Sequence, residues 1–258
     1  MLRLAVPHSV TNTYMKTKSS SAFTLIELLI VIAIIAILAS IALPAFIGVQ
    51  RRAKQTKDLS NGKQIVIALR QFALDNNGEF PNKAYSFGKS YTDSTLTVLG
   101  ASNTSNEAFQ WLIPTYTQSE EIFAVPGSKW NSPGPDNKID SNAGGETLKA
   151  GENGYGYTAA LQDTSNTLFP LVQDGWAAAG APSYVADTSL PGGVWSATKA
   201  VVIFPDGAGQ VMTVDDKTNL TVLRPGGYTY SIWDLSHSAS PDDWLATSNF
   251  LLNPITPP

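Results

Sequence analysis

The stretch SAFTLIELLIVIAIIAILASIALPAF, from Ser21 to Phe46, carries a single charged side chain, that of Glu27. No side chain from residue 28 to residue 50 is charged. A helix of that length spans about 35 Å at about 1.5 Å per residue, and the hydrocarbon core of a bilayer is about 30 Å thick. The sequence therefore predicts one membrane-spanning helix near the N-terminus, followed by a soluble body.

Glu27 is the exception within this apolar run. A carboxylate at the centre of a membrane helix costs about 2.5–3.5 kcal/mol on insertion scales, so such residues are by default functional candidates. The alternative is a carboxylate close to the headgroups that reaches out to water. Because Glu27 follows Phe23 by four residues, about one helical turn, the spacing favours the functional interpretation.

Cations flank the apolar run on both sides, at Arg3, Lys16, Lys18, Arg51, Arg52, Lys54 and Lys57. The positive-inside rule alone therefore leaves the orientation open. Since the whole chain has a net charge of −4 despite these cations, the body beyond them is strongly acidic, and we expect no direct binding of nucleic acid. The chain has no cysteine, which excludes disulfides, thiolate metal sites and cysteine nucleophiles.

The apolar run is predicted to continue as an amphipathic helix. Pro44 removes one backbone donor and is expected to kink the helix without ending it. Beyond it, apolar and small residues recur at three- and four-residue spacing, at Leu59, Gly62, Ile65, Val66, Leu69, Phe72 and Ala73. In DNNGEFP, residues 75–81, Gly78 predicts the helix end, and this reading is preferred to a calcium-like one. We expect one helix from about Phe23 to about Asn76, with residues 23–50 in lipid and residues 51–78 packed on a sheet.

Residues 79–258 are predicted to form a globular body rich in short strands. Residues 201–204 and 210–214 flank a Pro-Asp-Gly turn and predict a hairpin. Weaker predictions are a strand pair around Pro225–Gly227, strands in GYGYTAAL and TLFPLVQDGW, a short helix in EAFQWLIPTY, a loop-rich segment over residues 127–154 and an exposed tail, LLNPITPP. The predicted fold is α+β, with an antiparallel sheet on the second half of the long helix.

The segment AFTLIELLIVIAIIAILASIALPAF resembles the prepilin-type signal of type IV pilins and type II secretion pseudopilins. The resemblance rests on the small residue Ala22, on Phe23, on the Thr-Leu-Ile-Glu motif that ends at Glu27, and on Pro44 late in the run. It extends through RRAKQTKDLSNGKQIVIALRQFALDNNGEFP, which is similar to the second helical half of major pseudopilins. It implies a pilin-like fold.

The resemblance implies a leader peptide over residues 1–22 that stays in the cytoplasm, with translation expected to start at Met15. Prepilin peptidase would cut after Ala22 and methylate the amine of Phe23. The subunit would be a single-pass protein of the inner membrane with its body in the periplasm, and then part of a periplasmic pseudopilus or an extracellular pilus. Phe23, Glu27 and Pro44 would serve assembly. The implied partners are copies of the chain, other pilins or pseudopilins, the peptidase and an inner-membrane assembly platform.

Three functions remain open. The leading one is a structural pseudopilin of a type II secretion-like machine, favoured by the absence of the cysteine pair found in many true pilins. The second is a type IV pilin for adhesion, twitching or DNA uptake. The third is a membrane-anchored binding module that does not polymerise.

One residue of the motif departs from the family pattern, because Ala22 stands where a glycine is usual before the cut. An ordinary secretory signal is a further alternative, and the charge of Glu27 within the apolar run disfavours it.

The segment GPDNKIDSNAGGE contains a candidate calcium site. Asp136, Asp140, Asn142 and Glu146 space oxygen ligands along a Gly-rich loop, and calcium takes six to eight such oxygens. The spacing is not that of an EF-hand, and Asp and Asn are also ordinary turn formers. The turn is the simpler interpretation, and no other cofactor is expected.

We expect the chain not to be an enzyme. His237 is the only histidine after the leader, and although Ser236 and Asp242 lie near it, residues adjacent in sequence rarely form a triad and no nucleophile elbow is present. The tryptophans indicate either a binding face or, more commonly, core packing; they are Trp111, Trp130, Trp176, Trp195, Trp233 and Trp244.

Overall fold

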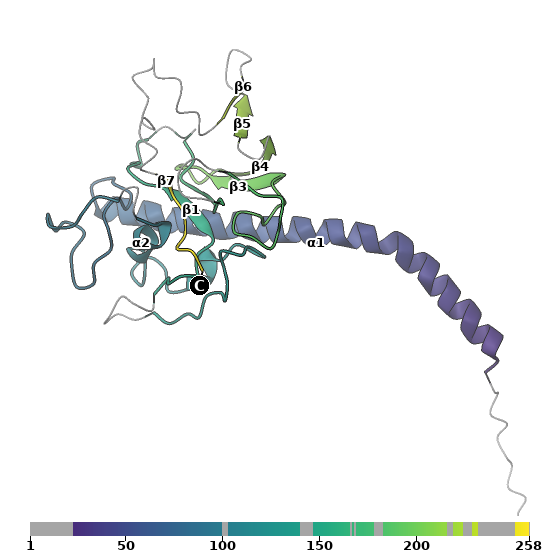
Figure 1. Ribbon diagram of the computed structural model, residues 1–258. Coiled ribbons are helices and arrows are strands. Elements are labelled where there is room, and N and C mark those ends of the chain that lie inside the picture. The colour runs from purple at the N-terminus through teal and green to yellow at the C-terminus, as the bar shows by residue number, and fades with distance from the viewer. Residues whose placement is uncertain are drawn as a thin grey trace, which may run out of the picture. The chain divides into compact units, whose positions relative to one another are not determined.

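The computed structural model of the chain (Figure 1) describes residues 23–99, 103–139, 147–165, 167, 169–177, 183–215, 219–223, 229–231 and 251–257. The chain divides into two compact units, Met1–Val49 and Gln50–Pro258. One helix, α1 (Leu25–Asp75), contributes to both units, and its length confirms the prediction of a single long helix. Pro44 lies inside α1 without ending it, since a proline removes only one helical hydrogen bond.

The part of α1 in the first unit is exposed at every residue from 25 to 49. By length and composition α1 is apolar enough to cross a membrane, as predicted.

The part of α1 in the second unit buries one face, formed by Asp58, Asn61, Gly62, Ile65, Val66, Ala68, Leu69, Phe72 and Ala73. The predicted apolar stripe is confirmed, except that Leu59 is only half-buried. Gly78 ends the helix as predicted: its backbone N–H donates to the carbonyl of Ala73 at 2.8 Å, and its φ of +82° suits glycine.

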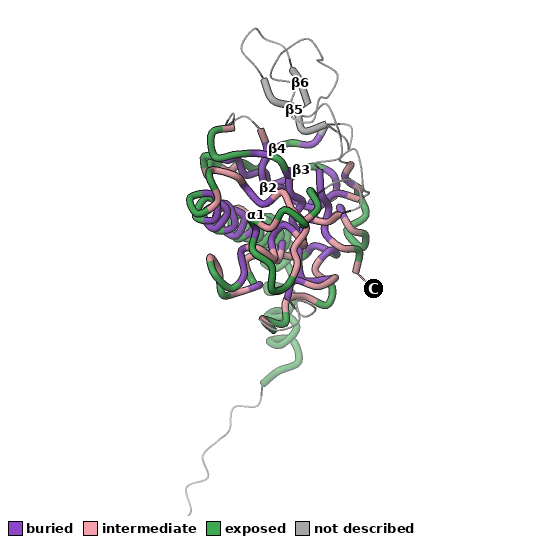
Figure 2. The backbone as a smooth tube through the Cα atoms, turned by 90° about the vertical axis from the view of Figure 1, so that its left-hand side faces the viewer, coloured by how far each residue is buried: buried purple, intermediate pink, exposed green. Residues whose placement is uncertain are grey.

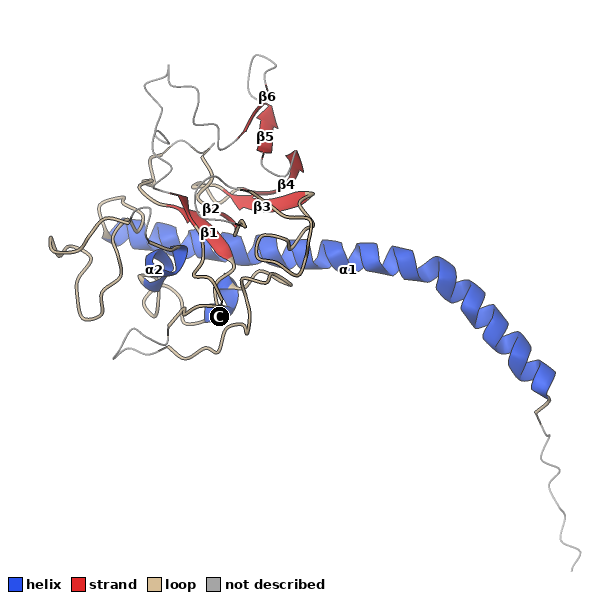
Figure 3. Cartoon of the chain, viewed as in Figure 1, coloured by secondary structure: helices blue, strands red, loops and turns tan. Residues whose placement is uncertain are grey.

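The second unit also contains a seven-stranded antiparallel sheet (Figure 3). Its strands are β1 (Tyr155–Thr158), β2 (Val172–Asp174), β3 (Lys199–Ile203), β4 (Gly209–Asp215), β5 (Asn219–Leu223), β6 (Thr229–Ser231) and β7 (Leu251–Leu252). They are ordered β6-β5-β4-β3-β2-β1-β7. The predicted hairpin is β3–β4, in which Val202 pairs with Gln210, and the predicted pair around Pro225–Gly227 is β5–β6. The predicted α+β, pilin-like architecture is therefore confirmed.

Two short helices precede the sheet in the chain. These are α2 (Ser105–Gln110), which confirms the predicted short helix, and the 3-10 helix η1 (Glu120–Phe123). The described residues of the segment 127–154 contain no helix or strand, in agreement with the loop prediction.

The prediction of an exposed C-terminal tail is wrong. Leu251 and Leu252 form β7, which pairs with β1, and both side chains are buried. Trp176 donates its backbone N–H to Oδ1 of Asn253 at 3.0 Å, and Nδ2 of Asn253 donates to the carbonyl of Trp176 at 2.8 Å. The pairing partners lie some 80–95 residues earlier in the chain, so no local pattern indicates this strand.

The sheet separates two clusters of buried side chains, and the alternation along β3 follows from the strand period of two. Val201 and Ile203 join the cluster that contains the buried face of α1, whereas Ala200 and Val202 join a second cluster with Trp176. Figure 2 shows buried positions gathered along the second part of α1 and the central strands.

The predicted core role of the tryptophans is confirmed for three of them, Trp130, Trp176 and Trp195, which are all at least 96% buried. Trp111 is half-buried, and Trp233 and Trp244 lie outside the described residues.

Two fully buried carboxyl groups connect α1 to the sheet. The hydroxyl of Tyr155 on β1 donates to Oδ1 of Asp58 on α1 at 2.6 Å. Oδ2 of Asp174, at the end of β2, accepts from Nε1 of Trp195 at 2.8 Å and from the backbone N–H of Val201 at 2.7 Å. The carboxyl groups of Asp58 and Asp174 lie close enough for each to affect the pKa of the other.

The pair is short of hydrogen-bond donors. Oδ2 of Asp58 and Oδ1 of Asp174 accept no bond from an N–H or O–H group. We infer that the Asp58 carboxyl keeps a proton and shares it with Asp174, because a protonated carboxyl is a donor. Burial raises the pKa of Asp58 well above its usual value, with the Asp174 charge adding to the effect, and burial raises the pKa of Asp174 to about 6.

We expect the pair to make the stability of the body depend on pH. Because the folded state holds these protons more tightly than the unfolded chain, the contribution of the pair to stability is fully present below about pH 4 and is lost as the pH rises through about 6. The Asp174 shift alone corresponds to a difference on the order of 3 kcal/mol. Urea unfolding of residues 50–258, followed by tryptophan fluorescence at pH 5 and pH 8, measures the effect.

The variant Asp58→Asn keeps the acceptor for Tyr155 and gives Asp174 a permanent N–H donor. It is expected to reduce the difference in stability between pH 5 and pH 8 and to raise stability at pH 8. The matched control is Asp206→Asn, because Asp206 is exposed and its Oδ1 accepts from the backbone N–H of Ala208. An equal pH dependence in wild type and Asp58→Asn contradicts the shared proton.

Candidate functional site

The first candidate site is the beginning of α1, where Thr24 and Glu27 cap the helix reciprocally. The backbone N–H of Glu27 donates to Oγ1 of Thr24 at 3.3 Å, and the backbone N–H of Thr24 donates to Oε2 of Glu27 at 2.8 Å. The Thr24 hydroxyl donates to the same Oε2 at 2.7 Å. This is the capping-box pattern, in which a threonine and a glutamate three residues later satisfy otherwise free N–H groups.

The capping box holds the Glu27 carboxylate at the end of the helix from which Phe23 extends. Both bonds from Thr24 reach Oε2, and among the described residues no bond to Oε1 is made. Phe23 is 72% exposed. One oxygen of the carboxylate is thus available to a group outside this helix. The capping role could have been predicted from the sequence, since Thr-x-x-Glu before an apolar run is its known signature.

Two further residues of this segment were predicted to function in assembly or cleavage, Pro44 and Ala22. Pro44 lies on the exposed part of α1, and Ala22, the residue predicted to precede the cut, lies outside the described residues.

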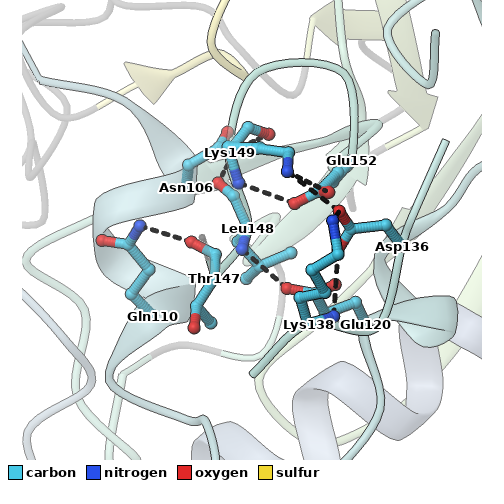
Figure 4. Close-up of polar contacts among 9 residues, drawn as sticks. All are labelled: Asn106, Gln110, Glu120, Asp136, Lys138, Thr147, Leu148, Lys149 and Glu152. Atoms are coloured by element: carbon cyan, nitrogen blue, oxygen red, sulfur yellow. Dashed lines mark hydrogen bonds and ion pairs between the residues drawn. The ribbon is translucent and has the colours of Figure 1, made fainter. Parts of the chain in front are cut away.

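The second candidate site is a cluster of three carboxylates from separate segments (Figure 4). Glu120 begins η1, Asp136 lies in the following loop, and Glu152 lies in the turn before β1. One carboxylate oxygen from each lies within 4.8 Å of the others. Glu120 and Glu152 are fully buried. We call these three residues the acidic cluster.

Backbone and lysine groups satisfy part of the acidic cluster. Oε1 of Glu120 accepts from the backbone N–H of Leu148 at 2.8 Å, and Oε2 of Glu152 accepts from the backbone N–H of Lys149 at 2.8 Å. The amine of Lys149 lies 2.9 Å from Oδ2 of Asp136 and 3.8 Å from Oε1 of Glu152. The amine of Lys138 lies 3.0 Å from Oδ2 of Asp136. The two lysines are therefore the present counter-charges of the cluster.

Helix α2 positions the segment that carries these donors. Nδ2 of Asn106 donates to the carbonyl of Leu148 at 2.6 Å, and Nε2 of Gln110 donates to the carbonyl of Thr147 at 2.8 Å (Figure 4). Leu148 is buried with a φ of +48°, an uncommon conformation for a leucine. The contacts from α2 hold that conformation in place.

The pKa values of the three carboxyl groups are shifted in opposite directions. Burial raises the pKa of Glu152 to about 7, with the Glu120 charge adding to the effect, and burial also raises the pKa of Glu120. Hydrogen bonds from Lys149 and Lys138 lower the pKa of Asp136. Oε2 of Glu120 and Oε1 of Glu152 are buried without a hydrogen-bond donor. Such oxygens are suited to a hard cation.

The structure brings only one of the four predicted calcium ligands into the described part of the chain, and this is Asp136. The other three, Asp140, Asn142 and Glu146, lie outside the described residues. Sequence reasoning missed Glu120 and Glu152, each 16 residues from Asp136, because nothing in the local spacing connects them. His237, Ser236 and Asp242 also lie outside the described residues.

Comparison with known proteins bears on the N-terminal segment. The model of the prokaryotic N-terminal methylation motif matches residues 17–43. The type IV wide pilus major component PilA4 of Thermus thermophilus is 36% identical over 91 residues, which cover 34% of this chain and 70% of that protein. This chain belongs to the family of type IV pilins and type II secretion pseudopilins.

Two further relatives are similar over shorter stretches. The type IV major pilin protein PilA of Myxococcus xanthus is 48% identical over 63 residues, which cover 24% of this pilin-family chain and 29% of that protein. The type II secretion system core protein G of Aeromonas hydrophila is 40% identical over 63 residues, which cover 24% of this chain and 44% of that protein. This chain therefore spans less than half the length of these two relatives. No solved structure matches.

Proposed function

We propose that the chain is a structural subunit of a pilin-type filament, assembled through its N-terminal helix. The observation that carries the proposal is the first part of α1. From residue 28 to residue 49 it is uncharged, and it is exposed throughout. None of the described residues covers this surface, and an apolar surface of this size is suited to lipid or to the same helix of other copies.

The methylation motif at residues 17–43 supports a proposed route to the filament. In this proposal prepilin peptidase cuts the inner-membrane precursor after Ala22 and methylates the new amine of Phe23. The assembly platform of the inner membrane then moves subunits into the filament. The body stays on the periplasmic side and becomes the outer layer of the filament.

Glu27 would set the register between subunits. After cleavage Phe23 carries a positive amine, and the capping box holds the Glu27 carboxylate at the same helix end. In a staggered bundle of helices, the free Oε1 of one subunit can meet the amine of a neighbour. An unpaired buried charge costs several kcal/mol, whereas the rest of the contact is apolar and similar at many offsets. One ion pair would therefore select the offset at which each subunit joins.

Within the family we assign the chain to the pseudopilins of a type II secretion-like machine. The absence of cysteine supports this assignment, and the likeness to PilA and PilA4 supports the alternative, a pilus for adhesion, twitching or DNA uptake. Deletion of the gene separates the two. Loss of secreted proteins from the medium with surface pili retained is expected for a pseudopilin, and the reverse result identifies a pilin. A chain that never forms filaments would be a membrane-anchored binding module.

We also propose that calcium binds the acidic cluster. Calcium prefers six to eight oxygen ligands, and the cluster offers carboxylates of which two oxygens are buried without a donor. Glu120, Asp136 and Glu152 would hold the ion, and Lys149 would give up its place beside Asp136. The predicted ligands Asp140, Asn142 and Glu146 remain proposals for the rest of the shell.

Glu27→Gln is predicted to leave membrane insertion and cleavage intact while filament yield falls sharply. The glutamine keeps an oxygen for Thr24 but has no charge for the amine of Phe23. Filaments are counted by electron microscopy, and N-terminal sequencing of the membrane fraction checks that the mature chain starts at methylated Phe23. In mixed expression the variant should enter wild-type filaments poorly.

Thr24→Val is the matched comparison, because it removes the cap but keeps the charge of Glu27. Its filament yield should fall less than that of Glu27→Gln. A normal filament yield from Glu27→Gln alone would exclude the register role and leave Glu27 as a residue that reaches the membrane surface.

Calcium is predicted to raise the melting temperature of residues 50–258, and a chelator is predicted to lower it. A ligand at about 100 times its dissociation constant adds about 2.7 kcal/mol, which corresponds to a shift of roughly 5–10 °C for a domain of this size. Differential scanning calorimetry with calcium or EDTA measures the shift. The double variant Glu120→Gln, Glu152→Gln should lose it.

Glu121→Gln is the control for the calcium experiment, because Glu121 neighbours Glu120 but is exposed. It should melt as the wild type does in both conditions. Identical melting of the wild type with calcium and with EDTA leaves Lys149 and Lys138 as the counter-charges of the cluster and rules out the metal.

A further inference from the structure

Four cations follow the apolar run of α1 within seven residues, at Arg51, Arg52, Lys54 and Lys57. We call these four residues the basic collar. All four side chains are exposed, and among the described residues none of them forms an ion pair. The collar is therefore a concentrated positive charge with no counter-charge in the described part of its own subunit.

No acidic side chain on the surface of α1 lies close enough in sequence to neutralise the charge of the collar. No acidic residue occurs between Glu27 and Asp58. Asp58 is buried and accepts from the hydroxyl of Tyr155, so it does not face the collar from the surface. Ordinary solvent-exposed helices alternate charges of both signs at three- and four-residue spacing, and this segment does not.

The cations surround the helix instead of marking one side of it. At about 100° per residue, Arg52, Lys54 and Lys57 lie roughly 100°, 300° and 240° around the axis from Arg51. A protein partner approaches a helix from one side and would meet only part of such a set. A layer of lipid headgroups surrounds a spanning helix and meets all of it.

The position along the helix agrees with a headgroup layer. The uncharged run over residues 28–50 is about as long as the hydrocarbon core is thick, so the collar begins where the headgroups begin. Arginine and lysine side chains at such positions extend towards phosphate level. Moreover, in the proposed orientation the collar lies on the translocated side, where the positive-inside rule disfavours cations. Their presence there indicates a partner on that side.

We propose that the basic collar binds anionic phospholipid headgroups at the outer face of the membrane that α1 spans. The collar fixes the depth of α1 and holds the subunit in the bilayer by a charge contact that must be released when the subunit leaves the membrane. This inference requires only that α1 spans a membrane, and it holds for a pseudopilin, a pilin or a non-polymerising anchor.

The test uses the processed full-length chain in nanodiscs made of equal amounts of phosphatidylcholine and phosphatidylglycerol. Native mass spectrometry counts the lipids of each kind that remain on the monomer. Since each cation near an anionic lipid surface strengthens binding roughly fivefold, the wild type should retain phosphatidylglycerol at least fivefold over phosphatidylcholine. A rise in salt should reduce this preference.

The variant in which all four collar residues are changed to Gln should retain the two lipids equally. Arg51→Lys with Arg52→Lys should keep the preference, which shows that charge is responsible. The control Lys63→Gln with Arg70→Gln removes two cations from the same helix beyond the collar and should also keep it. Circular dichroism checks that every variant remains helical.

Equal retention of both lipids by the wild type overturns the proposal, and so does an unchanged preference in the variant without the collar. If that variant keeps the preference and fails only in filament formation, the partner of the collar is the acidic body of a neighbouring copy.

Discussion

The body depends on one buried polar connection, that of Asp58 on α1 with Tyr155 and Asp174 on the sheet. The apolar face of α1 repeats every three to four residues and could pack on the sheet after a shift of one turn at modest cost. A buried carboxyl pair has no such freedom, because any other offset leaves its oxygens without donors and costs several kcal/mol. The pair thus selects one position of the helix on the sheet, although its burial works against stability at neutral pH.

In the proposed filament, a carboxylate also fixes the register of the first half of α1, as Asp58 does for the second half. An apolar helical surface gives attraction without register, and one carboxylate supplies the register. Asp58 is paired inside the subunit by Tyr155, whereas Glu27 is held ready by Thr24 with one oxygen free. The capping box therefore has a second effect beyond starting the helix: it restricts the rotamers of Glu27 before a neighbour arrives, which reduces the entropy that binding must overcome.

Local sequence patterns correctly predicted the elements that depend on neighbouring residues, namely α1 and its end at Gly78, the hairpin β3–β4 and the strand pair β5–β6. They did not predict the features that depend on contacts between segments far apart in the sequence. LLNPITPP looks like a tail because nothing within eight residues shows that β1 and Trp176 have open hydrogen-bonding groups for it. The acidic cluster was only partly predicted for the same reason, since Glu120 and Glu152 lie 32 residues apart in the chain. The capping box, in contrast, is a local pattern that could have been predicted, although the sequence analysis did not name it.

The C-terminal segment shows how the body is closed without cysteine. Asn253 occupies both backbone groups of Trp176, and its own carbonyl accepts from the backbone N–H of Ser105 at 2.9 Å. Asn106 accepts from the backbone N–H of Ile255 at 3.0 Å and donates to Leu148 beside the acidic cluster. Buried amides that serve several partners at once cross-link segments through hydrogen bonds, each worth about 1 kcal/mol. Because Asn106 joins both networks, an ion bound at the acidic cluster would also tighten the hold on the C-terminal strand.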